Sequence, residues 1–175
     1  MTTGATRAFS ALLVGVVVVL DQATKALVDR FFELHESRPL IEGLLHLTYV
    51  RNRGAAFGIM NEAGLPYQSV LFSVVSVLAL LAIAYYAWRL PASSTLPRVG
   101  LGLIMGGALG NLVDRVRFGY VIDFVDAFWG TYHWPAFNVA DSCITIGVSL
   151  LILDMLRNPQ PSTREGLPAS PAGGS

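Results

Sequence analysis

Two acidic residues of this sequence stand in apolar surroundings, where a carboxylate is costly unless it has a task. Asp123 lies between YVI and FV, and Asp141 lies between FNVA and SCITIG. Neither has a basic residue within one helical turn, so a local ion pair does not account for them. Two carboxylates that a fold brings together share one proton, so the ionised partner can take a proton from water while the protonated partner polarises a carbonyl. The pair therefore indicates hydrolysis that needs no metal ion.

Other hydrolytic chemistries have no support in the residue pattern. The three histidines, His35, His46 and His133, lack the HExxH spacing of a zinc protease, and there is no GxSxG motif. The single cysteine, Cys143, excludes an intrachain disulfide and a cysteine-based metal cluster, and its apolar neighbours predict a small buried residue. We therefore expect neither a metal nor a cofactor.

The composition is that of a membrane protein. Of the 175 residues, 53% are hydrophobic and only 14% are charged, whereas about a quarter of the residues of a soluble domain are charged. The mean hydropathy is +0.55. The formal net charge is zero and the basic residues are scattered, which argues against nucleic acid as a partner. The length suits one domain, which we expect to occupy residues 1–157.

Four segments are long and apolar enough to cross a membrane, which takes about 20 residues of helix. The first contains Asp21 and Lys25, which are one helical turn apart and can pair on one face of a continuous helix. No small-x-small cleavage site follows Leu20, so we expect a retained span and not a cleaved signal peptide. The predicted spans cover about 8–28, 65–88, 96–113 and 135–155.

The segments between the spans differ in kind. The long polar segment 29–64 predicts two short strands around a tight turn at Arg53 and Gly54. Residues 115–134 are predicted to form a loop whose aromatic residues favour the water–lipid boundary, and 158–175 a disordered tail. The predicted fold is therefore an all-α membrane protein of four transmembrane helices, with a small extracytoplasmic β-structured segment between helices 1 and 2.

Alternating spans bring most polar residues to one end of the bundle, since the ends of spans one and three meet the starts of spans two and four. Ionisable groups at membrane depth cost about 2.5–3.5 kcal/mol each and mark function by default. The alternative is that Asp21–Lys25 and Asp114–Arg115 are ion pairs that hold helix ends together. We expect Asp114 to pair with a nearby cation and Asp126 to be an exposed loop residue. The predicted cluster contains Asp21, Lys25, Asn52, Asn111, Asp114, Arg115, Asp123, Asn138 and Asp141.

Glycines at a spacing of four residues predict close helix packing in the third span. Gly102, Gly106 and Gly110 form the small-xxx-small pattern that lets membrane helices approach one another. We expect this stripe to serve packing only.

Five motifs in order resemble those of the bacterial lipoprotein signal peptidases, or signal peptidase II. They are DQATK (21–25), VRNRGAAFG (50–58), GNLVDR (110–115), VIDFVD (121–126) and FNVADSCITIG (137–147). Any one of them alone is a weak signal, but five in order are a specific one. The resemblance extends over about residues 10–155.

The resemblance implies an aspartyl protease that removes signal peptides from diacylglyceryl-modified prolipoproteins, cleaving before the lipidated cysteine. Asp123 and Asp141 match the catalytic dyad of that family. It further implies membrane lipids and globomycin-type inhibitors as partners. Arg53 departs from the family pattern and adds a positive charge that could alter signal-peptide preference. The positions that match supporting or substrate-contacting residues are Asp21, Lys25, Asn52, Gly54, Asn111, Arg115 and Asn138.

Two other functions fit parts of the pattern. A proton-coupled transporter also uses membrane carboxylates, but its path is lined across the membrane, whereas the charges here gather at one end. A non-enzymatic scaffold gives Asp123 and Asp141 no task. The distribution of basic residues mildly favours both termini in the cytoplasm. The active site would then face the outer leaflet of the bacterial inner membrane, where both long loops are expected to enclose the lipid-bearing substrate.

Overall fold

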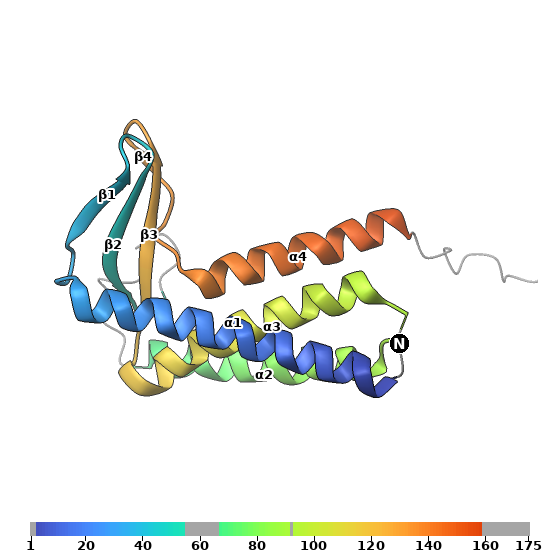
Figure 1. Cartoon of the computed structure of the whole chain (residues 1–175). Coiled ribbons are helices and arrows are strands. Elements are labelled where there is room, and N and C mark those ends of the chain that lie inside the picture. The colour runs from blue at the N-terminus through green and yellow to red at the C-terminus, as the bar shows by residue number, and fades with distance from the viewer. Residues whose placement is uncertain (1–2, 55–66, 92, 159–175) are drawn as a thin grey trace, which may run out of the picture.

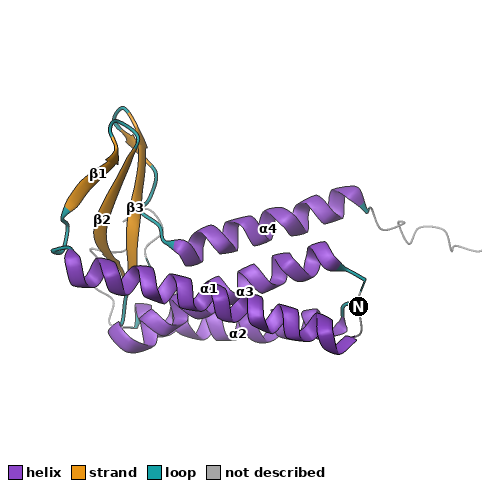
Figure 2. Ribbon diagram, in the orientation of Figure 1, coloured by secondary structure: helices purple, strands orange, loops and turns teal. Residues whose placement is uncertain are grey.

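Four long helices lie side by side, and a small antiparallel sheet stands at one end of them (Figure 1, Figure 2). The computed structural model describes residues 3–54, 67–91 and 93–158. The helices are α1 (Thr3–Phe31), α2 (Gln68–Arg89), α3 (Thr95–Phe118) and α4 (Val139–Arg157). Each is long and apolar enough to cross a membrane, which confirms the four predicted spans. α3 continues past the predicted end at Val113 to Phe118, so Asp114 and Arg115 belong to the helix.

The sheet contains four strands in the order β1-β2-β3-β4. Their bounds are β1 (Ser37–Ile41), β2 (Leu45–Asn52), β3 (Val121–Trp129) and β4 (Tyr132–His133). The prediction of a loop over 115–134 was therefore wrong for 121–129, and Asp123 lies on a strand. The β-branched and aromatic residues of VIDFVDAFW favour a strand once β2 is available to pair with it.

Glycines in the left-handed conformation set two of the chain reversals that build this sheet. Gly43, with φ 75°, lies in the tight connection between β1 and β2, so the hairpin turns at 42–44. The sequence reasoning missed this turn, whereas the strand predicted before Arg53 and Gly54 is present as β2, which ends at Asn52. Gly119, with φ 76°, ends α3 and lets the chain enter β3. The second strand predicted near 54–60, apart from Gly54, and the predicted tail, apart from Asn158, lie outside the described residues.

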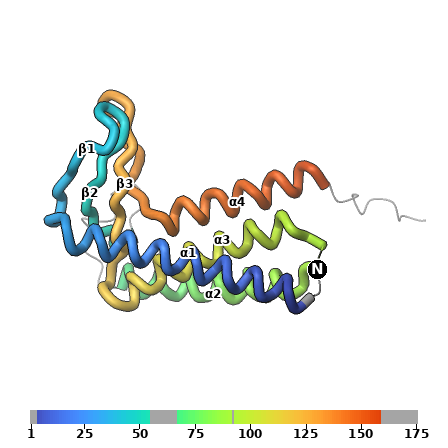
Figure 3. The backbone as a smooth tube through the Cα atoms, in the orientation of Figure 1, coloured from blue at the N-terminus to red at the C-terminus, as the bar shows by residue number. Residues whose placement is uncertain are grey.

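α3 is the central helix of the bundle and packs against the other three (Figure 3). The backbone of Gly102 and Gly106 lies against Leu13 and Val17 of α1. On another face, Gly107 meets the backbone of Ala140 in α4. Side chains at these positions would overlap the neighbouring helices, so the predicted packing role of the glycine stripe is confirmed.

α2 lies at the edge of the bundle and exposes most of its apolar side chains. In water such a surface would be unfavourable, whereas lipid is its natural environment. Its exposed apolar residues include Val70, Leu71, Val74, Leu78 and Leu81.

Candidate active site

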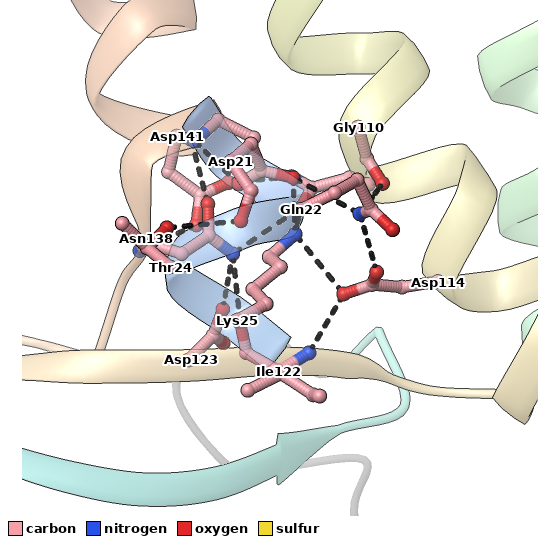
Figure 4. Close-up of polar contacts among 12 residues, drawn as sticks. Asp21, Gln22, Thr24, Lys25, Gly110, Asp114, Ile122, Asp123, Asn138 and Asp141 are labelled. Atoms are coloured by element: carbon pink, nitrogen blue, oxygen red, sulfur yellow. Dashed lines mark hydrogen bonds and ion pairs between the residues drawn. The ribbon is translucent and has the colours of Figure 1, made fainter. Parts of the chain in front are cut away.

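The predicted site residues converge at the end of the bundle that carries the sheet (Figure 4). α1 supplies Asp21 and Lys25, α3 supplies Asn111, Asp114 and Arg115, and α4 begins with Asn138 and Asp141. β3 supplies Asp123, β2 ends with Asn52, and Gly54 follows two residues later. Asp21, Lys25, Asn111, Asp114, Asp123 and Asn138 are all buried.

Asp123 is held by two neutral amides. It lies opposite Val50 in the ladder between β2 and β3 and is only 2% exposed. The Nδ2 of Asn52 donates to its Oδ2 at 2.9 Å, and the Nδ2 of Asn138 donates to its Oδ1 at 2.7 Å. No cation forms an ion pair with this carboxyl in the described part of the chain.

Asp141 is fixed by the start of α4. Asn138 is the N-cap, and its Oδ1 accepts from the Asp141 amide at 2.9 Å. In turn, the carboxylate of Asp141 accepts a hydrogen bond from the backbone amide of Asn138 at 3.2 Å, which completes a capping box. Asn111 Nδ2 donates to the other oxygen at 2.8 Å. Asn138 therefore contacts both Asp123 and Asp141 and links the two carboxyl groups.

The surroundings of Asp123 favour its neutral form. Burial, and then the nearby charge of Asp141, raise the pKa of Asp123 to about 7. The hydrogen bonds from Asn52 and Asn138 act in the opposite direction and offset only part of this effect. A carboxyl with this pKa can hold a proton near neutral pH, as acid–base catalysis requires.

A second group of carboxylates surrounds Lys25 beside the first. The Lys25 ammonium, 2% exposed, lies 2.9 Å from Asp21 and 3.0 Å from Asp114. It also donates to Asn111 Oδ1 at 2.8 Å, so it joins the two groups (Figure 4). The prediction that Asp114 pairs with a cation is confirmed, but the cation is Lys25 and not Arg115.

Asp21 and Asp114 also connect backbone elements. Asp21 accepts from the Ala140 amide at 3.0 Å, and Asp114 accepts from the Ile122 amide at 3.1 Å. They thereby hold the start of α4 and the start of β3, the two elements that carry Asp141 and Asp123. Gln22, which the sequence reasoning missed, donates to Asp114 at 2.8 Å and to the Gly110 carbonyl at 3.1 Å. Its position next to Asp21 in DQATK was the one available signal.

Arg115 offers an unused donor beside the carboxyl pair. Its charge interacts with Asp141, Asp123 and Asp114. Its guanidinium carbon lies 5.8 Å from the centre of the Phe72 ring, and its buried Nε has no hydrogen-bond partner among the described residues. A buried donor without a partner is costly, so a ligand carbonyl is a suitable acceptor for it.

Gly54 positions Asn52 at the end of β2. Its amide donates to Asn52 Oδ1 at 2.8 Å, which leaves the Asn52 Nδ2 directed at Asp123. Its φ of 107° and the Phe72 ring packed against it leave no room for a side chain. Arg53 is exposed.

The predictions for Asp126 and Cys143 were wrong. Asp126 was predicted to be an exposed loop residue, but it lies on β3 with 20% of its side chain exposed and pairs with His133 at 2.9 Å. β3 continues to the tip of the sheet, and this pair lies there, away from the carboxyl pair. Cys143 is a free cysteine of intermediate exposure, so the prediction of a buried residue was wrong. Among the described residues, no group of three His, Cys, Asp or Glu side chains is arranged to hold a metal ion.

A hollow of about 390 Å³ opens beside Asp141 on the outer side of α4. Besides Asp141, its lining consists of apolar side chains and of two hydroxyl side chains that already donate to backbone carbonyls, so the exposed lining is mostly apolar. The lining residues are Trp134, Phe137, Asp141, Ser142, Thr145 and Ile146.

Comparison with known proteins gives a consistent result. Residues 13–157 match the family described as signal peptidase (SPase) II. The lipoprotein signal peptidase of Geobacter sulfurreducens is 54% identical over 151 residues, which is 86% of this chain and 92% of that protein. The lipoprotein signal peptidase of Geobacter metallireducens is 48% identical over 159 residues, which is 91% of this chain and 96% of that protein. A solved bacterial membrane enzyme superposes with a TM-score of 0.78 at 33% identity, covering 91% of this chain and 94% of that one.

Proposed function

Since this chain belongs to the signal peptidase II family, we propose that it hydrolyses the signal-peptide bond of prolipoproteins with a pair of aspartates, Asp123 and Asp141. Removal of signal peptides from prolipoproteins is the activity that the family supports, and the proton-coupled transporter has no support from it. The proposal concerns the groups that carry out the cleavage and the form of the substrate.

One observation carries the assignment of the pair. Asp123 and Asp141 are both bonded to Asn138, and all their described hydrogen-bond donors are neutral amides. A shared proton can therefore move between the two carboxyl groups and the substrate without breaking an ion pair. Asp21 and Asp114 lack this freedom, because Lys25 is paired with both.

The proposed reaction starts with the shared proton on Asp123, whose raised pKa favours it there. Asp141 takes a proton from water, and the water oxygen attacks the scissile carbonyl carbon while the proton of Asp123 moves to the carbonyl oxygen. The tetrahedral intermediate then collapses. The C–N bond breaks, the leaving nitrogen takes a proton from Asp141, and the intermediate returns one to Asp123. The products are a signal peptide with a free carboxylate and a lipoprotein with a free amine at its cysteine.

The substrate is proposed to be diacylglyceryl-modified and to reach the dyad from the membrane. The apolar hollow beside Asp141 supports this route, since it is built on the outer side of a membrane-crossing helix. Arg115 is proposed to bind a substrate carbonyl through its unpartnered Nε. Asp21, Lys25, Asn52, Gly54, Asn111 and Asn138 are proposed to hold the site, and residues 1–157 to form the peptidase unit.

The orientation in the cell is also part of the proposal. We place the chain in the bacterial inner membrane with both termini in the cytoplasm and the dyad toward the outer leaflet. Exposed aromatic residues of the sheet region, Trp129, Tyr132 and Trp134, suit the lipid–water boundary at that surface.

The test is cleavage of a diacylglyceryl-modified prolipoprotein by the purified protein in detergent, followed as a mass shift on a gel. Wild type is compared with Asp123→Asn and Asp141→Asn, with Asp126→Asn as a matched control from the same strand. We expect cleavage by wild type and Asp126→Asn only, blocked by globomycin and unaffected by a chelator. Cleavage that survives substitution of Asp123 or Asp141 would reject the proposed dyad. Equal cleavage of a lipid-free peptide would reject the lipid requirement.

A further inference from the structure

A second hollow lies at the end of the bundle opposite the dyad, between α1, α2 and α3. Its volume is about 390 Å³. Figure 1 shows that the start of α1 and the connection from α2 to α3 lie at the end remote from the sheet. The lining residues are Arg7, Ser10, Ala11, Val14, Ala84, Ala87, Trp88, Arg98, Leu101, Gly102 and Met105.

The helix rise places this hollow at the other membrane surface from the dyad. Arg7 and Asp21 are fourteen residues apart on one continuous helix, which corresponds to about 21 Å along its axis. The hydrocarbon core of a bilayer is about 30 Å thick. A molecule in the hollow is therefore not a substrate in contact with Asp123 and Asp141.

The walls of the hollow suit an alkyl chain. Apart from the two arginines and Ser10, the lining residues are aliphatic, aromatic or small, and the Ser10 hydroxyl already donates to the Thr6 carbonyl at 3.2 Å. Trp88 is 65% exposed and stands at the end of α2, where an indole ring favours the lipid–water boundary.

The polar end of the hollow is positively charged and has no acidic lining residue. Arg98 is 8% exposed, and its guanidinium donates to the carbonyl oxygens of Leu90 and Pro91 at the end of α2. It lies in the first turn of α3, where the helix dipole favours an anion and no acidic residue is present. Neither Arg98 nor Arg7 forms an ion pair within the described residues.

We propose that this hollow binds one anionic phospholipid, with an acyl chain against the apolar walls and the headgroup phosphate between Arg7 and Arg98. The phosphate supplies the negative charge that the first turn of α3 and the two arginines lack. The bound lipid connects α1 to the α2–α3 connection at the end of the bundle remote from the sheet.

The experiment measures lipid binding to the delipidated full chain in a neutral detergent by native mass spectrometry. Phosphatidylglycerol is titrated against phosphatidylcholine of the same chain length. Arg7→Gln removes the exposed charge, and Ala87→Trp fills the apolar wall. Arg89→Gln is the matched control, because Arg89 lies at the same end but bonds to Tyr85 and does not line the hollow.

We expect wild type and Arg89→Gln to bind one phosphatidylglycerol in preference to phosphatidylcholine. Arg7→Gln should weaken that binding about fivefold, the factor that one basic residue contributes near an anionic lipid surface. Ala87→Trp should weaken both lipids. Equal binding of the two lipids by wild type, or an equal loss in Arg7→Gln and Arg89→Gln, would overturn the proposal. Competition by soluble glycerol phosphate as strong as that by the lipid would show a free-phosphate site instead.

Discussion

The structure contains two pairs of aspartates side by side, and they differ in what neutralises them. Asp21 and Asp114 share Lys25, which lies within 3.0 Å of both. Asp123 and Asp141 are bonded to the amides of Asn52, Asn111 and Asn138 and have no ion pair among the described residues. Burial is similar at Asp21, Asp114 and Asp123, so burial alone does not distinguish a structural acid from a catalytic one.

The difference shows how one end of a helix bundle can hold both kinds of acid. A buried ammonium that bonds to two carboxylates holds both in place, which suits groups that bind the Ala140 and Ile122 amides. Amide donors favour the ionised carboxyl group less strongly than a buried cation does, so burial and the charge of Asp141 still raise the pKa of Asp123 and a proton remains available. Lys25 also bonds to Asn111, so the structural pair orients one of the amides of the catalytic pair.

The strongest test of this comparison is to replace each aspartate by asparagine in turn. Asp123→Asn and Asp141→Asn should each reduce kcat by about 10³-fold or more, since a required proton carrier is lost. Their melting temperatures should change little. Asp21→Asn and Asp114→Asn should lower the melting temperature more than they lower the kcat of the folded fraction. The comparison fails if all four variants lose activity and stability in the same proportion.

Removing the shared cation should affect stability next most strongly. Lys25→Met leaves Asp21 and Asp114 buried without a cation, and breaking a buried ion pair in this way costs about 3–5 kcal/mol. Thermal unfolding in detergent measures the loss. The double variant Lys25→Met with Asp114→Asn should recover part of it, because one of the two unpaired charges is gone. A single variant as stable as wild type would contradict the structural role of Lys25.

The activity of the wild type should decline above a pH of about 7. The pKa of Asp123 is raised to about 7 by burial and by Asp141, so above that pH the pair loses its shared proton. On the alkaline side, kcat/KM should fall about tenfold per pH unit. Rates on a lipidated substrate at constant ionic strength measure this limb, and a flat profile up to pH 9 would contradict it.

The same raised pKa also makes stability depend on pH, over a range below that of the activity change. Because the folded state keeps the proton of Asp123 longer than the unfolded chain does, the free energy of unfolding should fall as pH rises from 3.8 to about 7. Below that window the contribution is fully favourable. The free energy of unfolding of wild type and of Asp123→Asn, measured at several pH values, isolates the contribution of Asp123, since the variant lacks this titration. An equal pH dependence in both proteins would contradict the prediction.

The smallest expected effect comes from Asn52. Asn52→Ala removes the 2.9 Å hydrogen bond to Asp123, a contact that lowers the pKa of this carboxyl. The pKa should therefore rise further, and the alkaline limb of the activity profile should move to higher pH. kcat should fall by at most about tenfold, the weight of one ordinary hydrogen bond. Asn158→Ala, at the far end of α4, is the control, and a shift to lower pH would contradict the assignment.

Local pattern was sufficient for the helices and for pairs within a helix. The four apolar segments predict four spans, and the four-residue spacing of Asp21 and Lys25 predicts their contact, because both features depend only on helix geometry. The loop predicted over 121–129 was wrong because a strand depends on its partner. β3 pairs with β2, about seventy residues earlier in the chain, and the same aromatic residues also fit a membrane-boundary loop.

The partner of Asp114 also required the tertiary structure. Neighbouring residues on a helix point about 100° apart, so Arg115 faces the Phe72 ring while Asp114 faces α1 and Lys25. Sequence adjacency was therefore a poor guide to pairing.

The sequence by itself determined that this is a four-span membrane protein with polar motifs gathered at one end, because hydrophobic length and helix alternation follow from the order of residues alone. It also placed Asp123 and Asp141 apart from the basic residues. Only the tertiary structure decided which acids share Lys25 and which are bonded to amides. That division depends on how α1, α3, β3 and α4 meet, and each contact joins residues distant in the chain.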